Sequence, residues 1–312
     1  MEEAVVMVAE PRDSPARVRA GGRPTVRVGA VQLRWHEDPG EHAQAIEAGV
    51  ASAAAAGALL VCLPELTLSR YFAVDPAGVA AAGAVPEELE DGPTFALASR
   101  LARGHGVHVH ASLFERADAP GGLGYNTAIL AGPDGVLVGR TRKLHIPITA
   151  GYHESAYFHP GPADEEAVRT FPVAGAAVGL PTCWDQWFPE LARAYCLVGA
   201  DVLVYPTAIG SEPDHPDFDT QPQWTGVMIG HAIANGLFIV AVNRYGNEGQ
   251  LTFYGSSFIA DPYGRILVRA PRDAPAVLVA DLDLDQRRDW LDLFPFPETR
   301  RPDAYGVLGE ER

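Results

Sequence analysis

Three β-rich runs of the sequence each end at a residue type that takes part in bond-cleaving chemistry. The first leads to Glu65, the second to Lys143 and the third to Cys183. A carboxylate, an ammonium and a thiol can serve together as general base, oxyanion partner and nucleophile. Because open α/β sheets bind ligands beyond the carboxyl ends of their strands, we expect these three side chains to meet in one site.

Cys183 differs from the other two cysteines in its surroundings. It leaves a strand at a turn and precedes Trp-Asp-Gln-Trp and a helix that begins at Pro189. Backbone N–H groups at such a turn favour a thiolate and an oxyanion. Cys62 and Cys196 lie in an apolar strand and an apolar helix, where cysteine usually packs as a small hydrophobe. From the spacing alone, Cys183 is equally compatible with a catalytic nucleophile and with a buried core residue.

Lys143 is the only lysine among 24 basic residues; the others are arginines. A chain that uses arginine for its surface charge has kept lysine at one position only. Lysine offers a compact ammonium, whereas arginine offers a spread, planar fork of donors. An oxyanion site needs the compact charge, which favours a catalytic role for Lys143. The alternative is that Lys143 has no special role and that a lysine stands there by chance in an arginine-rich chain.

Glu65 follows a proline at the end of an apolar strand. One interpretation is an exposed carboxylate at the start of a loop, the commonest fate of glutamate. The other is a desolvated general base that takes the thiol proton. No Gly-x-Ser-x-Gly nucleophile elbow offers a rival serine.

The composition excludes several function classes. The 312 residues carry a net charge of −16, which disfavours nucleic acid and anionic membrane surfaces as partners. Three cysteines do not suggest a disulfide scaffold, and a reducing, cytoplasmic location is expected. His105, His108 and His110 lack a cysteine partner, so we expect no metal. No phosphate-binding glycine motif appears, so we expect no nucleotide cofactor. The longest weakly polar run, residues 48–64, is typical of an Ala-rich helix that leads into a strand, so we expect no membrane span.

Strand-like and helix-like segments alternate along most of the chain, which predicts an α/β layered fold. We expect a flexible tail over residues 1–24 and a single domain over 25–308 that includes a C-terminal assembly segment. Two similar Pro/Gly turns, at 131–138 and 260–267, predict hairpins. The likeness indicates either two related halves or the ordinary similarity of hairpins. The predicted strands are 26–33, 58–63, 107–114, 127–130, 136–138, 176–180, 202–205, 238–242, 256–259, 266–268 and 277–280, and the predicted helices are 41–56, 93–103, 189–198 and 223–235.

The sequence motifs around the three candidate residues resemble those of a known family. Leu-Pro-Glu65-Leu surrounds the glutamate, Arg-Lys143-Leu-His-Ile-Pro the lysine, and Cys183-Trp-Asp-Gln-Trp-Phe-Pro-Glu the cysteine. In this order they resemble the catalytic set of the nitrilase, or carbon–nitrogen hydrolase, superfamily. The resemblance extends over 26–308, and within the superfamily it is strongest to the N-carbamoylputrescine amidases.

The resemblance implies a four-layer αββα sandwich in which helices flank two mixed sheets, associating into dimers or larger homo-oligomers. It also implies cofactor-free hydrolysis of a C–N bond in a small amide or ureide. Glu65 would be the base, Cys183 the nucleophile, and Lys143 with the Trp184 N–H the oxyanion site. Glu154, eleven residues after the lysine, matches the family's second glutamate and would orient Lys143.

Candidate contacts for the substrate come from the same region and are less specific. An N-carbamoylputrescine tail carries an ammonium, which needs a carboxylate. Glu212 is the first candidate, Asp185 and Asp219 are weaker ones, and Tyr71 is a further substrate-binding candidate. No arginine occurs between Arg193 and Arg244, which disfavours a carboxylated substrate such as N-carbamoyl-β-alanine. Another amide or nitrile hydrolase, or a non-enzymatic binding protein on the same fold, remains the alternative.

Overall fold

The computed structural model describes residues 4–119 and 123–310 of the chain. Its α-helices are α1 (Pro39–Ala55), α2 (Val79–Ala82), α3 (Pro93–His105), α4 (Pro189–Leu197), α5 (Gln221–Asn235) and α6 (Asp285–Leu293). Its strands are β1 (Val5–Val8), β2 (Thr25–Gln32), β3 (Leu60–Cys62), β4 (His108–Glu115), β5 (Tyr125–Ala131), β6 (Leu137–Arg142), β7 (Thr170–Val173), β8 (Ala176–Gly179), β9 (Val202–Thr207), β10 (Phe238–Asn243), β11 (Tyr245–Asn247), β12 (Thr252–Tyr254), β13 (Phe258–Ala260), β14 (Ile266–Arg269) and β15 (Ala276–Asp283).

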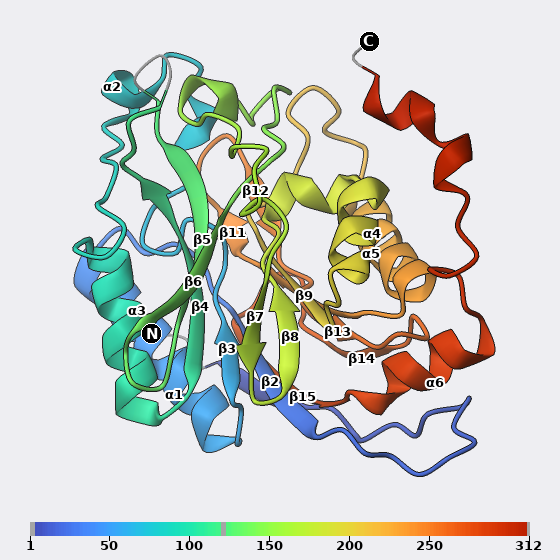
Figure 1. Cartoon of the computed structure of the whole chain (residues 1–312). Helices are drawn as coiled ribbons and strands as arrows, with labels where there is room; N and C mark the ends of the chain where they lie inside the picture. The colour runs from blue at the N-terminus through green and yellow to red at the C-terminus, as the bar shows by residue number, and fades with distance from the viewer. Residues whose placement is uncertain (1–3, 120–122, 311–312) are drawn as a thin grey trace.

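Two sheets lie face to face between two helical layers (Figure 1). The first has the order β1-β15-β2-β3-β4-β5-β6 and the second β14-β13-β10-β9-β8-β7. Helices α1 and α3 cover the outer face of the first sheet, and α4 and α5 cover that of the second. This arrangement confirms the predicted four-layer αββα sandwich.

The side-chain alternation of the strands explains why four layers form. In β2, Val28 and Ala30 face the second sheet, whereas Val31 faces the helical layer of α1 and α3. Central strands such as β9 and β10 are buried on both faces, which is typical of parallel strands covered on both sides. The inter-sheet core therefore joins both halves of the chain into one hydrophobic unit.

The two halves share a strand topology. β2, β3 and β4 run parallel and are followed by the antiparallel β5 and β6. β8, β9 and β10 likewise run parallel and are followed by the antiparallel β13 and β14. Both predicted hairpins are present as β5–β6 and β13–β14, so the likeness of the two turns extends to the topology of the halves.

The predicted flexible tail is wrong for the part that the structure describes; residues 1–3 lie outside it. β1 runs parallel to β15 and extends the first sheet at its edge. Further along, Arg17 bonds Asp289 and Arg23 forms a two-pronged pair with Asp201. These arginines therefore hold the N-terminal segment against the domain, because their carboxylate partners come from distant parts of the chain.

Among the described helices, none combines the length and apolar character needed to cross a bilayer.

Candidate active site

Cys183 lies at a strained turn between strand β8 and the short 3-10 helix η4 (Cys183–Trp187). Its φ angle is 41°, in the left-handed region that residues other than glycine seldom adopt. Asp185 Oδ2 accepts the backbone N–H of Thr182 at 2.9 Å and so caps this turn. Such strain persists where the surrounding structure enforces it, and it is common at functional sites.

Lys143 lies between two carboxylates in the interior. Its Nζ donates to Glu154 Oε2 at 2.6 Å and to Glu65 Oε1 at 3.0 Å. All three side chains are at most 1% exposed. An ammonium has three donors, so one N–H remains after these two bonds. The free donor gives the buried lysine a means of binding an oxyanion.

Burial and mutual charge perturb the titration of this cluster. Burial alone would lower the pKa of Lys143, but the adjacent Glu154 and Glu65 carboxylates raise it overall. Burial raises the pKa of Glu154 to about 7 against the opposing effect of Lys143. Burial and the Glu65 carboxylate raise the pKa of the Cys183 thiol well above its usual value. The resting cysteine is therefore a thiol that needs a base.

A cavity of about 270 Å³ opens onto Cys183. Its polar lining includes Cys183, Glu154, Glu212 and Thr220. Its apolar and aromatic lining includes Tyr152, Trp184, Trp187, Ile209 and Phe218. The cavity suits a small molecule with a reactive polar group at one end and an aliphatic chain.

Comparison with known proteins agrees with this geometry. The family model for carbon–nitrogen hydrolases matches residues 27–292. The chain belongs to the carbon–nitrogen hydrolase family. An N-carbamoylputrescine amidase of Arabidopsis thaliana is 40% identical over 92% of this chain and 96% of its own length. A citrullinase of Francisella tularensis is 38% identical over 91% and 98%.

A solved structure of a nitrilase-superfamily amidase from Nesterenkonia adds a chemical observation. It is 26% identical, covers 92% of this chain and 98% of its own, and has a TM-score of 0.70. In that amidase, the acetamide moiety of fluoroacetamide is covalently added at the active-site cysteine. The present carbon–nitrogen hydrolase is thus an enzyme of the class that cleaves C–N bonds with a cysteine nucleophile.

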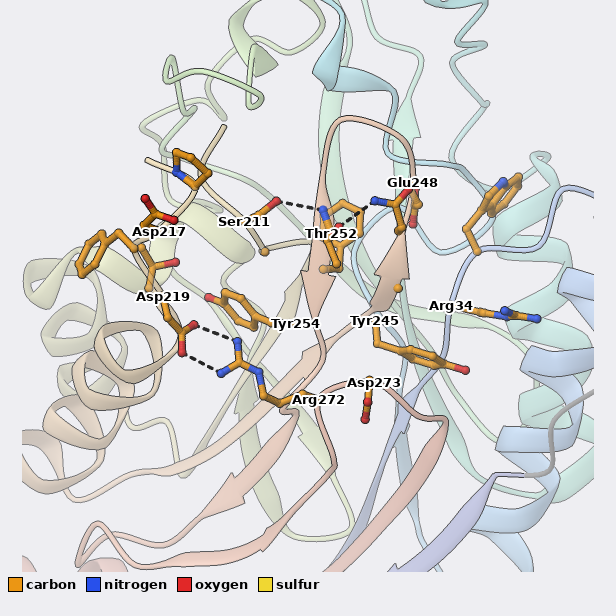
Figure 2. A pocket seen from close by; sticks show the side chains of 18 residues that line it. Arg34, Ser211, Asp217, Asp219, Tyr245, Glu248, Thr252, Tyr254, Arg272 and Asp273 are labelled. Atoms are coloured by element: carbon orange, nitrogen blue, oxygen red, sulfur yellow. Dashed lines mark hydrogen bonds and ion pairs between the residues drawn. The ribbon is translucent and has the colours of Figure 1, made fainter. Parts of the chain in front are cut away.

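The carboxylates predicted for the substrate tail lie in different surroundings. Glu212 lines the catalytic cavity and is half-buried, and its Oε1 accepts from Thr220 Oγ1 at 3.2 Å. Among the described residues it forms no ion pair. Asp219 instead pairs with Arg272 at 2.8 and 2.9 Å, on the wall of a larger neighbouring cavity of about 820 Å³ (Figure 2). Asp219 is therefore already neutralised, whereas Glu212 is available.

Asp185 and Tyr71 do not line the cavity of this hydrolase, contrary to expectation. Glu65 and Lys143 do not line it either, and Lys143 is connected to it through its bond to Glu154. Asp185 accepts from the N–H groups of Thr182 and His145, because the cap of η4 directs its carboxylate inward. It thereby ties the nucleophile turn to the segment after Lys143. Tyr71 is fully buried and donates to Glu154 Oε1 at 2.9 Å. Both residues act on catalytic groups from behind the cavity.

Trp184 follows the nucleophile in the first turn of η4 and lines the cavity with its side chain. In a 3-10 helix the first N–H groups have no earlier carbonyl within the helix. The backbone N–H of Trp184 therefore stays a prediction for the oxyanion site. No group of three or more His, Cys, Asp or Glu side chains suited to a metal ion occurs within residues 4–119 and 123–310.

Several residues of the site escaped the sequence analysis. Tyr152 lines the cavity, and its Oη accepts from Gly210 N at 3.0 Å and donates to Ser211 O at 3.3 Å, next to Glu212. Asn126 donates to Glu65 Oε1 at 2.8 Å. A signal existed for Asn126, because it is a polar amide next to the apolar run Ala128–Ala131. The contacts of Tyr152 depend on loops that only the fold brings together.

Proposed function

We propose that this enzyme hydrolyses an N-carbamoyl amine whose other end carries an ammonium, with N-carbamoylputrescine as the best candidate. The observation that carries the proposal is one small cavity that Cys183 and Glu154 line together with the Glu212 carboxylate. Among the described residues, Glu212 has no ion-pair partner and accepts a hydrogen bond from Thr220. The described residues that line the cavity include no arginine or lysine, so a cationic tail finds a partner and a carboxylate does not.

In the proposed first half-reaction, Glu65 takes the proton of the Cys183 thiol and the sulfur attacks the carbamoyl carbon. Charge developing on the carbonyl oxygen is stabilised by the remaining N–H of Lys143 and the backbone N–H of Trp184. The tetrahedral intermediate collapses with cleavage of the C–NH₂ bond, and Glu65 returns the proton to the departing ammonia. A thiocarbamate on Cys183 remains, still carrying the amine.

The second half-reaction consumes water. Glu65 removes a proton from a water molecule, whose oxygen attacks the thiocarbamate carbon while the C–S bond breaks and the proton passes to sulfur. The released carbamate decomposes to the free amine and carbon dioxide. Glu154 takes part indirectly, since its carboxylate holds the Lys143 ammonium at 2.6 Å.

Citrulline is the second candidate, because a citrullinase of similar length is 38% identical to this chain. Citrulline adds an α-carboxylate to the same ureide and ammonium chemistry. That carboxylate would face Glu212 without an arginine on the cavity wall. Binding it would leave two like charges close together, which disfavours citrulline relative to the decarboxylated analogue.

The substrate proposal is tested by measuring ammonia release from four compounds in parallel: N-carbamoylputrescine, citrulline, N-carbamoyl-β-alanine and a simple aliphatic nitrile. We expect the highest kcat/KM for N-carbamoylputrescine. A higher value for citrulline would reassign the substrate within the ureides. A preference for the nitrile or the β-alanine derivative would contradict the assignment of the cavity residues.

We also propose that copies of this chain associate through the outer helical layer of the second half. Leu197, Val198 and Ile233 of that layer are 48%, 51% and 38% exposed, although all are apolar. Exposed apolar side chains that gather on one face are typical of interfaces. Sedimentation equilibrium should give a dimer or a larger species, and Ile233→Asp should shift it toward monomer; a wild-type monomer would contradict the proposal.

A reducing compartment suits the proposed chemistry. All three cysteines are free and buried. We infer that the enzyme works in the cytoplasm, where the Cys183 thiol stays reduced. Fractionation that finds the active protein in an oxidising compartment would contradict this inference.

A further inference from the structure

Asn126 is a fully buried polar residue in strand β5, which continues after Thr127 with the apolar core residues Ala128, Ile129 and Leu130. A buried amide costs free energy unless its donors and acceptor are paired. The partners of Asn126 therefore indicate what the amide is retained for. They lie on three different segments, around Glu65, Ser112 and Lys143.

The orientation of the Asn126 amide is fixed by Ser112. Ser112 Oγ accepts the backbone N–H of Leu66 at 3.1 Å and donates its only proton to Asn126 Oδ1 at 3.3 Å. With Oδ1 occupied, the amide presents Nδ2 to Glu65 Oε1 at 2.8 Å. The chain of bonds thus starts at the backbone beside Glu65 and returns to the Glu65 side chain, which locks the carboxylate relative to its own main chain.

The main chain of Asn126 holds the second charged group. Its carbonyl accepts the backbone N–H of Lys143 at 2.8 Å. One residue thereby contacts the side chain of Glu65 and the backbone of Lys143, whose own side chains meet at 3.0 Å. The spacing between base and ammonium depends on this shared support.

The two carboxylate oxygens of Glu65 differ in their hydrogen-bond partners. Oε1 receives both Asn126 Nδ2 and Lys143 Nζ. Oε2 is buried and has no hydrogen-bond partner among the described residues. Because Oε1 is saturated by two donors, Oε2 is the oxygen left for proton transfer.

We propose that Asn126 is a positioning residue that holds Glu65 Oε1 so that Oε2 serves as the proton acceptor for Cys183 and for water. The inference rests on the proposed function, because it presumes that Glu65 is the base. It differs from a purely structural role in one respect. Loss of the amide should slow proton transfer even in a protein that stays folded and binds its substrate normally.

The test uses Asn126→Leu, which keeps the size of the side chain and removes both polar atoms. A lost hydrogen bond to a charged group predicts a fall in kcat of about 10- to 100-fold, with KM little changed. The rate at which iodoacetamide alkylates Cys183 should fall in parallel, because alkylation also needs the thiolate. Ser112→Ala frees the amide to rotate and also removes the acceptor of the Leu66 N–H, while it leaves Asn126 Nδ2 in place, so it should give a smaller loss of kcat in the same direction.

Thr127→Val is the matched control. Thr127 is the next residue of β5, is also fully buried, and donates to Glu115 Oε2 at 2.5 Å. It loses one hydrogen bond to a buried carboxylate outside the catalytic cluster, so it should lower thermal stability without lowering kcat or the alkylation rate. An equal loss of kcat in Thr127→Val would show that the effect of Asn126 is structural and would overturn the proposal.

The remaining outcomes separate this inference from the proposed function. Wild-type kcat and alkylation in folded Asn126→Leu would overturn the positioning role alone. Should Asn126→Leu fail to fold, wild-type kcat and alkylation in Ser112→Ala would overturn it instead. Retained turnover in Cys183→Ala would overturn the nucleophile assignment, whatever the Asn126 variants do.

Discussion

Two parts of the catalytic site are built on opposite principles: the buried cluster of Glu65, Lys143 and Glu154, called the closed end below, and the Glu212 loop, called the open end. At the closed end, Glu65, Lys143 and Glu154 are inaccessible to solvent and bond one another directly. At the open end, Glu212 is half-buried on a loop and accepts a hydrogen bond from the neutral hydroxyl of Thr220 at 3.2 Å. The closed end can perform one chemistry in one geometry, whereas the open end can exchange its partner without disturbing the fold.

Burial sets the energetic difference between the ends. A buried ion cluster is costly to desolvate, and removing one member leaves an uncompensated charge worth about 3–5 kcal/mol. A half-exposed carboxylate keeps much of its hydration, so its replacement affects binding more than stability. The comparison therefore predicts catalytic losses at the closed end and losses of selectivity at the open end.

The largest effect should follow from Cys183→Ala. Without the sulfur no covalent intermediate forms, and turnover should fall by at least about 10⁴-fold. Ammonia release measured with a coupled assay checks this. Cys62→Ala serves as the control, since Cys62 is a core residue between the sheets and its loss should lower stability while turnover persists. Equal activity of the two variants would remove the distinction between nucleophile and core cysteine.

Lys143→Arg should be nearly as damaging although the charge is kept. The wider, planar guanidinium does not fit between Glu65 and Glu154 and cannot aim a compact charge at the oxyanion. We expect a loss in kcat of about 10²- to 10³-fold. Arg142→Lys is the reciprocal control at the next residue, where the partner is Glu115. It should keep near-wild-type turnover; near-wild-type turnover of Lys143→Arg as well would make the single lysine a coincidence.

Glu212→Gln should act on selectivity. The charge-assisted bond to an ammonium tail is lost, which predicts a rise in KM for N-carbamoylputrescine of about 10- to 100-fold. The kcat/KM for a ureide with a neutral alkyl tail should hardly change. Asp219→Asn is the control, because Asp219 is already paired with Arg272 (Figure 2). A neutral-tail ureide that suffers as much as N-carbamoylputrescine would refute the assignment of Glu212.

The smallest effect concerns pH. Burial raises the pKa of Glu154 to about 7, and the hydrogen bond from Tyr71 opposes that rise. Lys143 needs the ionised Glu154, so kcat/KM should fall as pH drops through about 7. Tyr71→Phe removes a bond that favours the ionised form, so the pKa rises further and the acid limb should move to higher pH. An acid limb that stays in place, or moves to lower pH, would contradict the role given to Tyr71.

The sequence supported the closed end better than the open end, for a physical reason. Glu65 and Lys143 follow β3 and β6 of the first sheet, and Cys183 follows β8 of the second sheet, which packs face to face with the first. Their meeting therefore follows from local patterns once the layers are known. The alternation of strands and helices predicted a layered α/β fold, and the family resemblance implied its four layers.

The contacts that tune the site were not predictable in this way. Asp185 was expected to face the substrate, but the cap of a short 3-10 helix turns it inward. The N-terminal segment 1–24 was expected to be flexible, yet Arg23 pairs with Asp201, which lies 178 positions further along the sequence. Both outcomes depend on tertiary partners that no local pattern encodes.

The most direct test of the whole account is the mass of the intermediate on Cys183. Rapid acid quench of the enzyme with N-carbamoylputrescine, followed by intact-protein and peptide mass spectrometry, should reveal an adduct equal to the substrate less ammonia. It should map to the peptide that contains Cys183 and be absent from Cys183→Ala. An adduct on another residue, or steady turnover in Cys183→Ala, would contradict the account.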